Sequence, residues 1–351
     1  MFNSIVKIKN LKIGGKNRCA LIAEAGVNHD GSLDKAYRLI DAASRAKADF
    51  VKFQNFNPDR LLIKKLEKAE YQKKGDGTKG TYHDMISRLT LSKDVTKKLA
   101  SYCKKKKINF MSTPFDTESV DLLNSVGVSV FKIDSGNLNN HPHIRYIARK
   151  MKPVILSTGM SSIAEIDEAI NVIKDTGNRN LILLHCTSSY PADVKLINLR
   201  AMETLRLQYN IPVGYSDHTQ GIHIPTAACA LGAHMIEKHF TLDRNAVGPD
   251  HKASILPSQL AQMSKDLKST HIALGISGKI KNEIEVKLGR TLRRSLVVEK
   301  NIRKGEKLST KNLSLKRPGD GIPSKYLKII TGRKSLKSLK RDHVLSWSDF
   351  G

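Results

Sequence analysis

Eight times in its first 242 residues the chain runs through a short apolar stretch that ends in polar or charged residues. These runs cover residues 21–26, 50–56, 108–115, 130–136, 153–159, 181–189, 211–219 and 235–242. An amphipathic stretch separates successive runs. The stretch 161–175, for example, places on one helical face Ile163, Ile166, Ala169, Ile170 and Ile173. Strand-like runs alternating with helical patterns indicate parallel βαβ units, and eight such units predict an α/β fold of the (β/α)8 TIM barrel type.

The active site of such a barrel lies at the carboxyl ends of its strands. The residues that end the eight runs are therefore candidate site residues. They are Glu24, Lys52, Gln54, Thr113, Lys132, Ser135, Ser157, His185, Ser216, His218, Glu237 and His239. The fold prediction thus also predicts where the site lies.

The 351 residues suffice for one barrel and a small second domain. We expect the barrel domain at 1–275, a polar, glycine-punctuated linker at 276–289 and a compact β-rich domain at 290–351. The alternating start of the chain predicts a β-hairpin around Gly14-Gly15 that closes the amino end of the barrel.

The bulk composition favours a cytoplasmic protein. No apolar run reaches the roughly 18–20 residues of a membrane span, and the start lacks the apolar core of a secretory signal. The four cysteines are scattered without CxxC spacing, which indicates reduced thiols.

The net charge of +27, from 60 basic against 33 acidic residues, raises nucleic-acid binding as a hypothesis. No aromatic stacking pattern accompanies the basic runs, however, so we do not expect a nucleic-acid partner. The other interpretation is a generally basic surface that attracts anionic substrates.

Two histidines end neighbouring strands. Period two puts Glu237 and His239 on one side of their strand, and His218 ends the strand before it. Adjacent strands lie about 4.8 Å apart, so both imidazoles can share one small ion, for which Mn²⁺ with waters suits better than a closed zinc site. The alternative is that each histidine only forms hydrogen bonds within the barrel mouth.

The remaining polar residues suit an anionic ligand. Lys52 and Lys132 would supply ammonium groups in a confined pocket, and Ser135-Gly136 and Ser157-Thr158-Gly159 would supply hydroxyls and closely approaching backbone. Thr113 and Ser216 add donors. Each Ser/Thr-Gly turn, taken alone, is also an ordinary helix cap. The set together predicts a small phosphorylated acid as ligand.

Other roles remain open for two of these residue types. A lysine inside a barrel is compatible with a Schiff-base aldolase, although the second lysine and the expected metal favour anion binding over imine formation. Glu24 can orient substrate hydroxyls or act as acid or base, or it can pair structurally with a lysine.

Nine motifs make the chain resemble the sialic acid (nonulosonic acid) synthase family, from Ile22 almost to its end. In order they are AEAGVNHDG (23–31), VKFQ (51–54), STPFD (112–116), LSTGM (156–160), LLHCTSSYP (183–191), GYSDHT (214–219), EKHFT (237–241), GPDHKAS (248–254) and KRPGDGI (316–322). The resemblance also identifies the terminal segment as an antifreeze-like SAF domain.

The resemblance implies an activity: condensation of phosphoenolpyruvate with N-acetylmannosamine or a 2,4-diacetamido-trideoxymannose and water, giving N-acetylneuraminate or legionaminate and phosphate. It implies that phosphoenolpyruvate contacts Lys52, Lys132, Ser135, Ser157, Ser216 and Thr113, and that the amino sugar contacts Gln54, Tyr190, Glu237 and Asp250. His218 and His239 would hold Mn²⁺ or Mg²⁺. Glu24 would move protons. A domain-swapped homodimer is also implied, with Arg317 reaching the sugar in the neighbouring subunit's site.

Three departures from the family pattern bear on the sugar. Asp134 and Asn137 replace residues of the usual motif after Lys132, and Ser188 stands where some relatives have Asn, a change expected to keep a polar contact. The region 57–92 differs most from neuraminate-making relatives, and its EYQKK (70–74) is closer to legionaminate-making enzymes. The sequence leaves the choice between the two sugars open, as well as another barrel lyase or phosphoenolpyruvate-condensing reaction.

Overall fold

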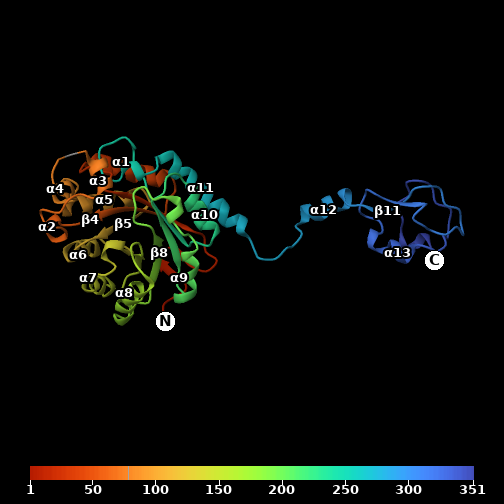
Figure 1. Ribbon diagram of the computed structural model, residues 1–351, viewed down its shortest axis with the longest axis horizontal. Coiled ribbons are helices and arrows are strands. Elements are labelled where there is room, and N and C mark those ends of the chain that lie inside the picture. The colour runs from red at the N-terminus through yellow and green to blue at the C-terminus, as the bar shows by residue number, and fades with distance from the viewer. Residues whose placement is uncertain (78) are drawn as a thin grey trace. The chain divides into compact units, whose positions relative to one another are not determined.

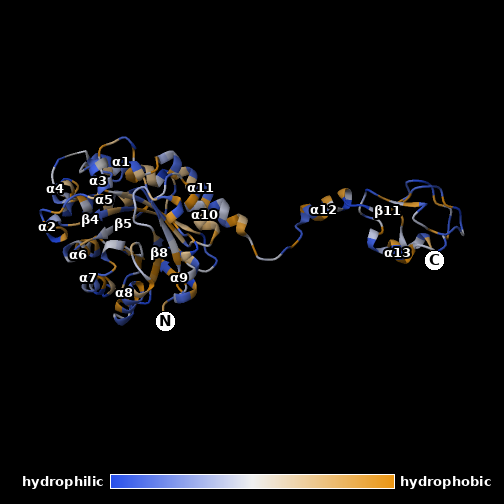
Figure 2. Cartoon of the chain, in the orientation of Figure 1, coloured by the Kyte–Doolittle hydropathy of each residue, from blue (hydrophilic) through white to orange (hydrophobic). Residues whose placement is uncertain are grey.

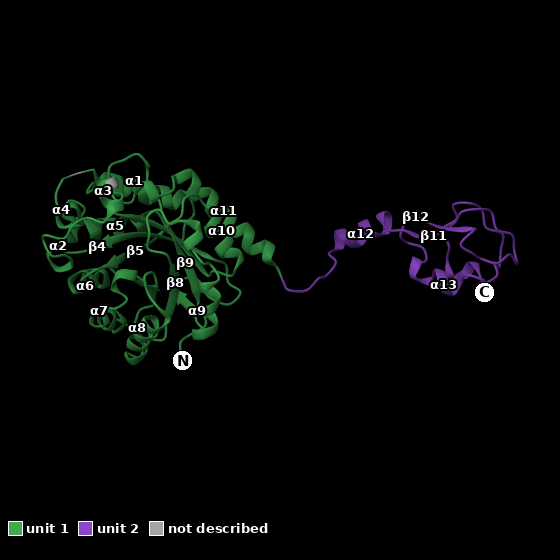
Figure 3. Ribbon diagram, viewed as in Figure 1, with its two compact units in different colours: residues 1–275 green, residues 276–351 purple. Residues whose placement is uncertain are grey.

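The computed structural model describes residues 1–77 and 79–351, which form two compact units at 1–275 and 276–351 (Figure 3). No helix among the described residues combines the length and apolar character needed to cross a membrane.

The first unit is built on eight parallel strands (Figure 1). They are β3 (Ala20–Gly26), β4 (Phe50–Asn55), β5 (Asn109–Pro114), β6 (Phe131–Ile133), β7 (Val154–Ser157), β8 (Leu181–Cys186), β9 (Val213–Asp217) and β10 (Met235–His239). Their order is β5-β4-β3-β10-β9-β8-β7-β6, and β5 and β6 lie close together without a ladder of hydrogen bonds. Each predicted run contains one strand, so the predicted barrel is confirmed as a nearly closed ring.

Helices follow the strands and cover the outside of the ring. They are α1 (Leu33–Arg45), α5 (Lys93–Lys105), α6 (Thr117–Ser125), α7 (His141–Ala148), α8 (Ile163–Asp175), α9 (Ala201–Tyr209), α10 (His223–Ala230) and α11 (Pro257–Leu274), with short 3-10 turns η1 (Ser135–Asn137), η2 (Val194–Leu196) and η3 (His251–Ala253). In Figure 2 the outer helices carry both hydrophobic and hydrophilic residues along each ribbon. This is the pattern of helices that pack on a core by one face.

Helix α8 shows how the local sequence sets such an element. Ser162 accepts a hydrogen bond from the Glu165 backbone N–H while the Glu165 carboxylate accepts one from the Ser162 N–H, a capping box. The predicted apolar face is buried at Ile166, Ala169, Ile170 and Ile173, but Ile163 in the first turn is 38% exposed.

The connection from β4 to α5 is longer than the others and adds three short helices. They are α2 (Pro58–Leu61), α3 (Glu70–Asp76) and α4 (Tyr82–Ser87). We call its described part, 57–77 and 79–92, the cap segment.

The amino end of the barrel is closed by the predicted hairpin. Strands β1 (Val6–Ile8) and β2 (Leu11–Ile13) pair antiparallel, with Ile8 opposite Leu11. The turn is therefore at Lys9-Asn10, where Lys9 has φ 50°, and the predicted turn at Gly14-Gly15 was wrong. Val6, Ile8 and Ile13 pack against inward residues of the strands, so the hairpin plugs this end.

The second unit is a small β-rich fold around its own core. It contains α12 (Glu283–Leu292), the antiparallel pair β11 (Ser295–Val298) and β12 (Leu313–Lys316), η4 (Ser324–Tyr326), α13 (Leu327–Ile330) and η5 (Trp347–Asp349). Leu296, Val298, Leu308 and Leu345 are among its buried residues. Helix α12 begins inside the range 276–289 that we expected as linker, with Asn282 as its side-chain cap.

We predict that Ile8→Ala destabilises the protein by about 2–5 kcal/mol, because it leaves a cavity under the plug where Ile8 is 1% exposed. Urea unfolding measures this change. Lys7→Ala is the matched control: Lys7 lies on the exposed side of the same strand, so its effect should stay within about 0.5 kcal/mol. Equal effects of the two substitutions would contradict the packing of the plug.

Candidate active site

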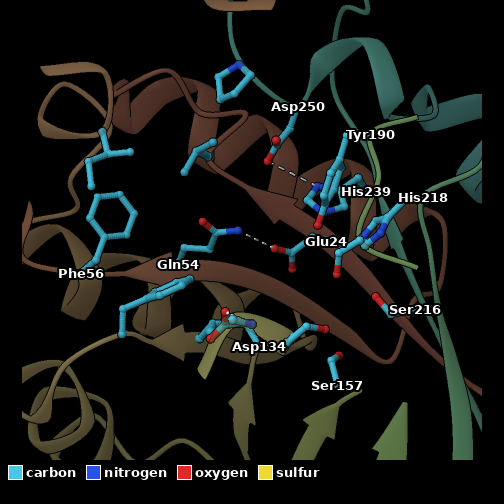
Figure 4. A pocket seen from close by; sticks show the side chains of 18 of the residues that line it. Glu24, Gln54, Phe56, Asp134, Ser157, Tyr190, Ser216, His218, His239 and Asp250 are labelled. Carbon is cyan, nitrogen blue, oxygen red and sulfur yellow. Dashed lines mark hydrogen bonds and ion pairs between the residues drawn. The ribbon is translucent and has the colours of Figure 1, made fainter. Parts of the chain in front are cut away.

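A cavity of about 350 Å³ opens at the carboxyl ends of the strands (Figure 4). Of the residues predicted for the site, those that line it are Glu24, Lys52, Gln54, Thr113, Lys132, Ser135, Ser157, Ser188, Tyr190, Ser216, His218, Glu237, His239 and Asp250. Arg317, also predicted for the site, belongs to the second unit, where it follows β12 and is exposed.

His185 was placed at a strand end by the sequence but does not face the cavity. On β8, Leu184 lies inside the barrel and Cys186 lines the cavity, so the side chain between them points outward. The His185 Nε2 atom lies 2.7 Å from the carbonyl oxygen of Ile197. This histidine therefore serves the outer packing.

Strand alternation explains why the other residues converge. Lys52 and Gln54 on β4, and Glu237 and His239 on β10, are each two positions apart and share a side of their strand. The ladder sets Glu24 opposite both Lys52 and His239. Neighbouring strands thus bring the carboxylate, the ammonium and the imidazole to one height in the barrel.

The floor of the cavity is a buried charge cluster. Lys52 Nζ lies 2.9 Å from Glu24 Oε2 and 3.4 Å from Glu237 Oε2, and it donates to Thr113 Oγ1 at 3.1 Å. Lys132 Nζ lies 3.8 Å from Glu237 Oε1, which also accepts a hydrogen bond from Ser216 Oγ at 2.8 Å. Two lysines therefore share one central carboxylate.

The two carboxylates differ in pKa although both are buried. Burial raises the pKa of Glu24 to about 7, and Lys52 only partly opposes this. Burial also acts on Glu237, but Lys132 and Lys52 together outweigh it and hold its pKa at about 2. Glu237 is therefore the permanent anion of the cluster, whereas Glu24 can exchange a proton near neutral pH.

The two lysines also differ in the direction of their pKa shifts. Burial lowers the pKa of Lys132. Burial also opposes charge on Lys52, but Glu237 and Glu24 outweigh it and raise the pKa of Lys52. Lys52 thus stays an ammonium group because of its two carboxylate partners.

Hydroxyl groups border the lysines. Ser135 Oγ accepts a hydrogen bond from the Gly159 backbone N–H at 2.9 Å, and a Cβ on Gly159 would lie 2.8 Å from that oxygen. Only glycine lets the backbone approach so closely. Ser157 Oγ is buried and has no hydrogen-bond partner among the described residues, so it is available to a ligand.

Asp134, which replaces a residue of the usual family motif, lines the cavity but is held by its own turn. Its carboxylate caps η1 by accepting from the Gly136 N–H at 2.9 Å and from the Asn137 side-chain amide at 2.7 Å. These two hydrogen bonds occupy the carboxylate beside Lys132.

The two histidines meet at the wall of the cavity, with ring centroids 5.5 Å apart. His218 Nδ1–H donates to the Thr187 carbonyl at 2.8 Å, so Nε2 carries the lone pair whenever this imidazole is neutral. Burial opposes charge on His218, but Cys186 and the Thr187 carbonyl outweigh it and raise its pKa. His239 Nδ1 is buried without a hydrogen-bond partner in the described part of the chain; Asp250 Oδ2 lies 3.7 Å away. Burial and His218 keep the pKa of His239 well below its usual range, so this imidazole is neutral.

These features fit two imidazole ligands to a metal ion. Within the described residues, no group of three or more His, Cys, Asp or Glu side chains is placed to hold a metal. The remaining ligands would therefore have to be water or substrate oxygens, which is typical of an open site rather than a closed structural one.

The sequence interpretation missed the part of the lining that comes from the cap segment. Tyr71 stacks on Tyr190 with 5.0 Å between ring centroids, and Tyr190 lies 4.1 Å from the His218 ring. Gln72, Tyr82 and apolar residues of α4 also line the cavity. The apolar spacing of Met85, Ile86 and Leu89 was the available signal, but it does not reveal which partner that face meets.

A second buried ion pair lies just outside the barrel, behind the histidines. Lys238 pairs with Asp217, and both side chains are 0% exposed. The Asp217 carboxylate also accepts from Tyr215 and Thr219 hydroxyls, at 2.9 and 3.0 Å. Because Asp217 precedes His218 and Lys238 precedes His239, this pair holds the two histidine-bearing strand ends together.

Comparisons with known proteins identify the family. The model of the NeuB family matches residues 39–279, and the model of the SAF domain matches residues 293–351. The N,N'-diacetyllegionaminic acid synthase of Campylobacter jejuni is 45% identical over 93% of this chain and 98% of its own length. The enzyme of the same name from Legionella pneumophila is 40% identical over 97% of each chain.

More distant relatives have related activities or the same fold. Mouse N-acetylneuraminate-9-phosphate synthase is 35% identical, over 95% of this chain and 93% of its own. The crystal structure of an N-acetylneuraminic acid synthetase from Leptospira borgpetersenii, in complex with citrate, has a TM-score of 0.73 and 35% identity, covering 82% of this chain and 95% of its own.

The fold and the site thus define a barrel synthase with an appended SAF domain, and the chain belongs to the NeuB family. The predicted enzyme class, a phosphoenolpyruvate-condensing transferase that forms a C–C bond, is confirmed. The predicted SAF domain is confirmed as well. The alternative of a different barrel lyase is not supported, because the named relatives are synthases.

We predict that Lys238→Met destabilises the protein by about 3–5 kcal/mol, because it leaves the Asp217 carboxylate buried without its cation. Adding Asp217→Asn should recover part of the loss, since it removes the uncompensated charge. Urea unfolding of the two variants and the parent measures both effects. A Lys238→Met protein as stable as the parent would contradict this role of the pair.

Proposed function

We propose that the protein condenses phosphoenolpyruvate with 2,4-diacetamido-2,4,6-trideoxymannose and water, giving N,N'-diacetyllegionaminate and phosphate. The observation that carries the proposal is the charge cluster, in which two buried lysines stand in one cavity beside two histidines. The two legionaminic acid synthases, at 45% and 40% identity, support this sugar over N-acetylmannosamine, because the mouse neuraminate-type relative is 35% identical.

In this proposal Lys52 and Lys132 bind the phosphate and carboxylate of phosphoenolpyruvate, with Thr113 near the carboxylate. Ser135, Ser157 and Ser216 donate further hydrogen bonds. The support is electrostatic: a multiply charged anion stabilises two buried ammonium groups that otherwise share one permanent carboxylate.

His218 and His239 would hold a divalent ion, Mn²⁺ or Mg²⁺. Synthases of this family generally use a divalent metal, and Nε2 of a neutral His218 and the unpartnered Nδ1 of His239 suit one. When bound, the ion would polarise the aldehyde oxygen of the open-chain sugar, which is worth on the order of several kcal/mol.

The chain's own residues position the reactants and move protons. C3 of phosphoenolpyruvate forms a bond to the aldehyde carbon, water adds at C2, and the C2–O bond to phosphate breaks. Glu24 is the group we assign to proton transfer, because its pKa of about 7 lets it give and accept a proton near neutrality. Gln54 Nε2, 3.4 Å from Glu24 Oε1, would orient that carboxyl group.

The sugar would contact Gln54, Ser188, Tyr190, Glu237 and Asp250, which line the cavity. Holding both reactants in one desolvated site supplies the rest of the rate gain. The predicted cytoplasmic location fits this chemistry, because phosphoenolpyruvate is made there.

We also propose a domain-swapped homodimer in which Arg317 reaches the sugar in the neighbouring subunit's site. What supports it is that Arg317 is exposed on the surface of the second unit, so its guanidinium is not buried in the core of that unit.

We expect phosphate release from phosphoenolpyruvate, with Mn²⁺ present, to be faster with 2,4-diacetamido-2,4,6-trideoxymannose than with N-acetylmannosamine. Chelation should abolish release, and added Mn²⁺ should restore it. Faster release with N-acetylmannosamine would assign the enzyme to neuraminate instead. No release with either sugar from folded, metal-loaded protein would overturn the proposal.

Arg317→Ala should raise the KM for the sugar more than that for phosphoenolpyruvate, because the guanidinium would contact only the sugar. Mixing this variant with His239→Ala should restore part of the activity, since one of the two sites in a mixed dimer keeps both residues. Steady-state kinetics before and after verified subunit exchange measures the recovery. Its absence would exclude sites shared between subunits.

A further inference from the structure

The cavity has two chemically different halves. Charged and hydrogen-bonding groups gather around Lys52, Lys132 and the histidines, whereas the other side is apolar. In Figure 4, Phe56 lies across the cavity from His218 and Ser216, with Gln54 and Glu24 between them. The family assignment accounts for the charged half and leaves the apolar half without a role.

The apolar half is a separate hydrophobic cluster that opens into the cavity. Its buried members Val27, Phe56, Met85, Ile86 and Leu89 all line the cavity, and Phe115 packs against them. The Phe56 and Phe115 rings meet edge to face, 6.0 Å apart. We call these six residues the apolar wall. The apolar wall belongs to neither of the two hydrophobic cores of the barrel. Its side chains face the cavity instead.

The cap segment carries three of these six residues, Met85, Ile86 and Leu89, and it is fixed to the barrel by polar contacts. The Gly248 N–H donates to the Gly75 carbonyl at 3.1 Å, and a Cβ on Gly75 would lie 2.7 Å from the Gly248 oxygen. Buried Lys68 pairs with Asp76 at 2.6 Å, and Arg88 reaches the same carboxylate at 3.1 Å. These contacts join α3 to the residue after α4, so the wall is preorganised.

Such a wall distinguishes sugars by the groups that they present to it. A methyl group gains by leaving water against apolar side chains, whereas a hydroxyl there loses its hydrogen bonds to water without replacement. The two candidate sugars differ in this respect. In the trideoxy sugar C6 is a methyl group and C4 carries a second acetamido group, whereas N-acetylmannosamine has a hydroxyl on each of these two carbons.

Resting on the proposed function, we infer that the apolar wall is the specificity-determining surface of this synthase and that it receives the C6 methyl group of a 6-deoxy amino sugar. Adding a hydroxyl to a substrate that fits an apolar pocket costs about 10- to 100-fold in kcat/KM. The wall should therefore impose a preference of that size for the 6-deoxy form of any accepted sugar.

The test compares N-acetylmannosamine with 2-acetamido-2,6-dideoxymannose, which differ by one oxygen, alongside the trideoxy sugar. The parent enzyme should prefer the 6-deoxy sugar by about 10-fold or more in kcat/KM. Met85→Gln should lower that ratio about 10-fold, because it places an amide of similar size in the wall. Met85→Leu, the matched apolar control, should leave the ratio nearly unchanged, and the KM for phosphoenolpyruvate should stay constant in both.

Phe115→Tyr provides a second variant in case Met85→Gln does not fold, since Phe115 is only partly buried and the change adds one hydroxyl. It should lower the same ratio. A parent enzyme that releases phosphate with the trideoxy sugar but shows no 6-deoxy preference, or variants that keep the preference, would overturn the role of the wall alone. A parent enzyme inactive with every sugar would overturn the proposed function instead.

Discussion

The site depends on one constraint: two lysine ammonium groups are held inside a barrel, away from water. Burial of an unpaired charge is costly, so Glu237 must stay ionised between Lys52 and Lys132. The same lysines outweigh burial and hold the pKa of Glu237 at about 2, while burial, which Lys52 only partly opposes, raises the pKa of Glu24 to about 7. The same charge cluster thus supplies two ammonium groups for an anion. It also keeps Glu237 ionised and lets Glu24 exchange a proton.

The period-two alternation of β10 links this cluster to the histidines. Glu237 and His239 face the cavity, and Lys238 between them faces outward to Asp217. This outward ion pair fixes the strand ends that carry His218 and His239. The positions of the two histidines in the cavity therefore depend on an ion pair outside the barrel. Residues of the cap segment then complete an apolar surface together with Val27, Phe56 and Phe115, which directly follow β3, β4 and β5.

Much of the fold and site could be predicted from the sequence, and the failures have physical reasons. The eight apolar runs gave the strands, because a parallel strand covered on both faces must be apolar along its length. His185 was misplaced because position in the run does not say which face a side chain takes. The hairpin turn lies at Lys9-Asn10 and not at the predicted position, because alternation alone does not fix the register of two strands. The lining from the cap segment was missed since no local signal shows where three short helices fold back.

The sequence by itself determined the barrel, the family and the residues at the strand ends, because periodicity and motif order are local properties. Only the tertiary structure decided which of those residues form ion pairs with one another. Glu237 lies 185 positions after Lys52 in the chain, yet adjacent strand ends bring their side chains to 3.4 Å. Only the packing of Met85 in the cap segment against Phe56, which follows β4, decided that half of the cavity is apolar, because that surface exists only once distant segments meet.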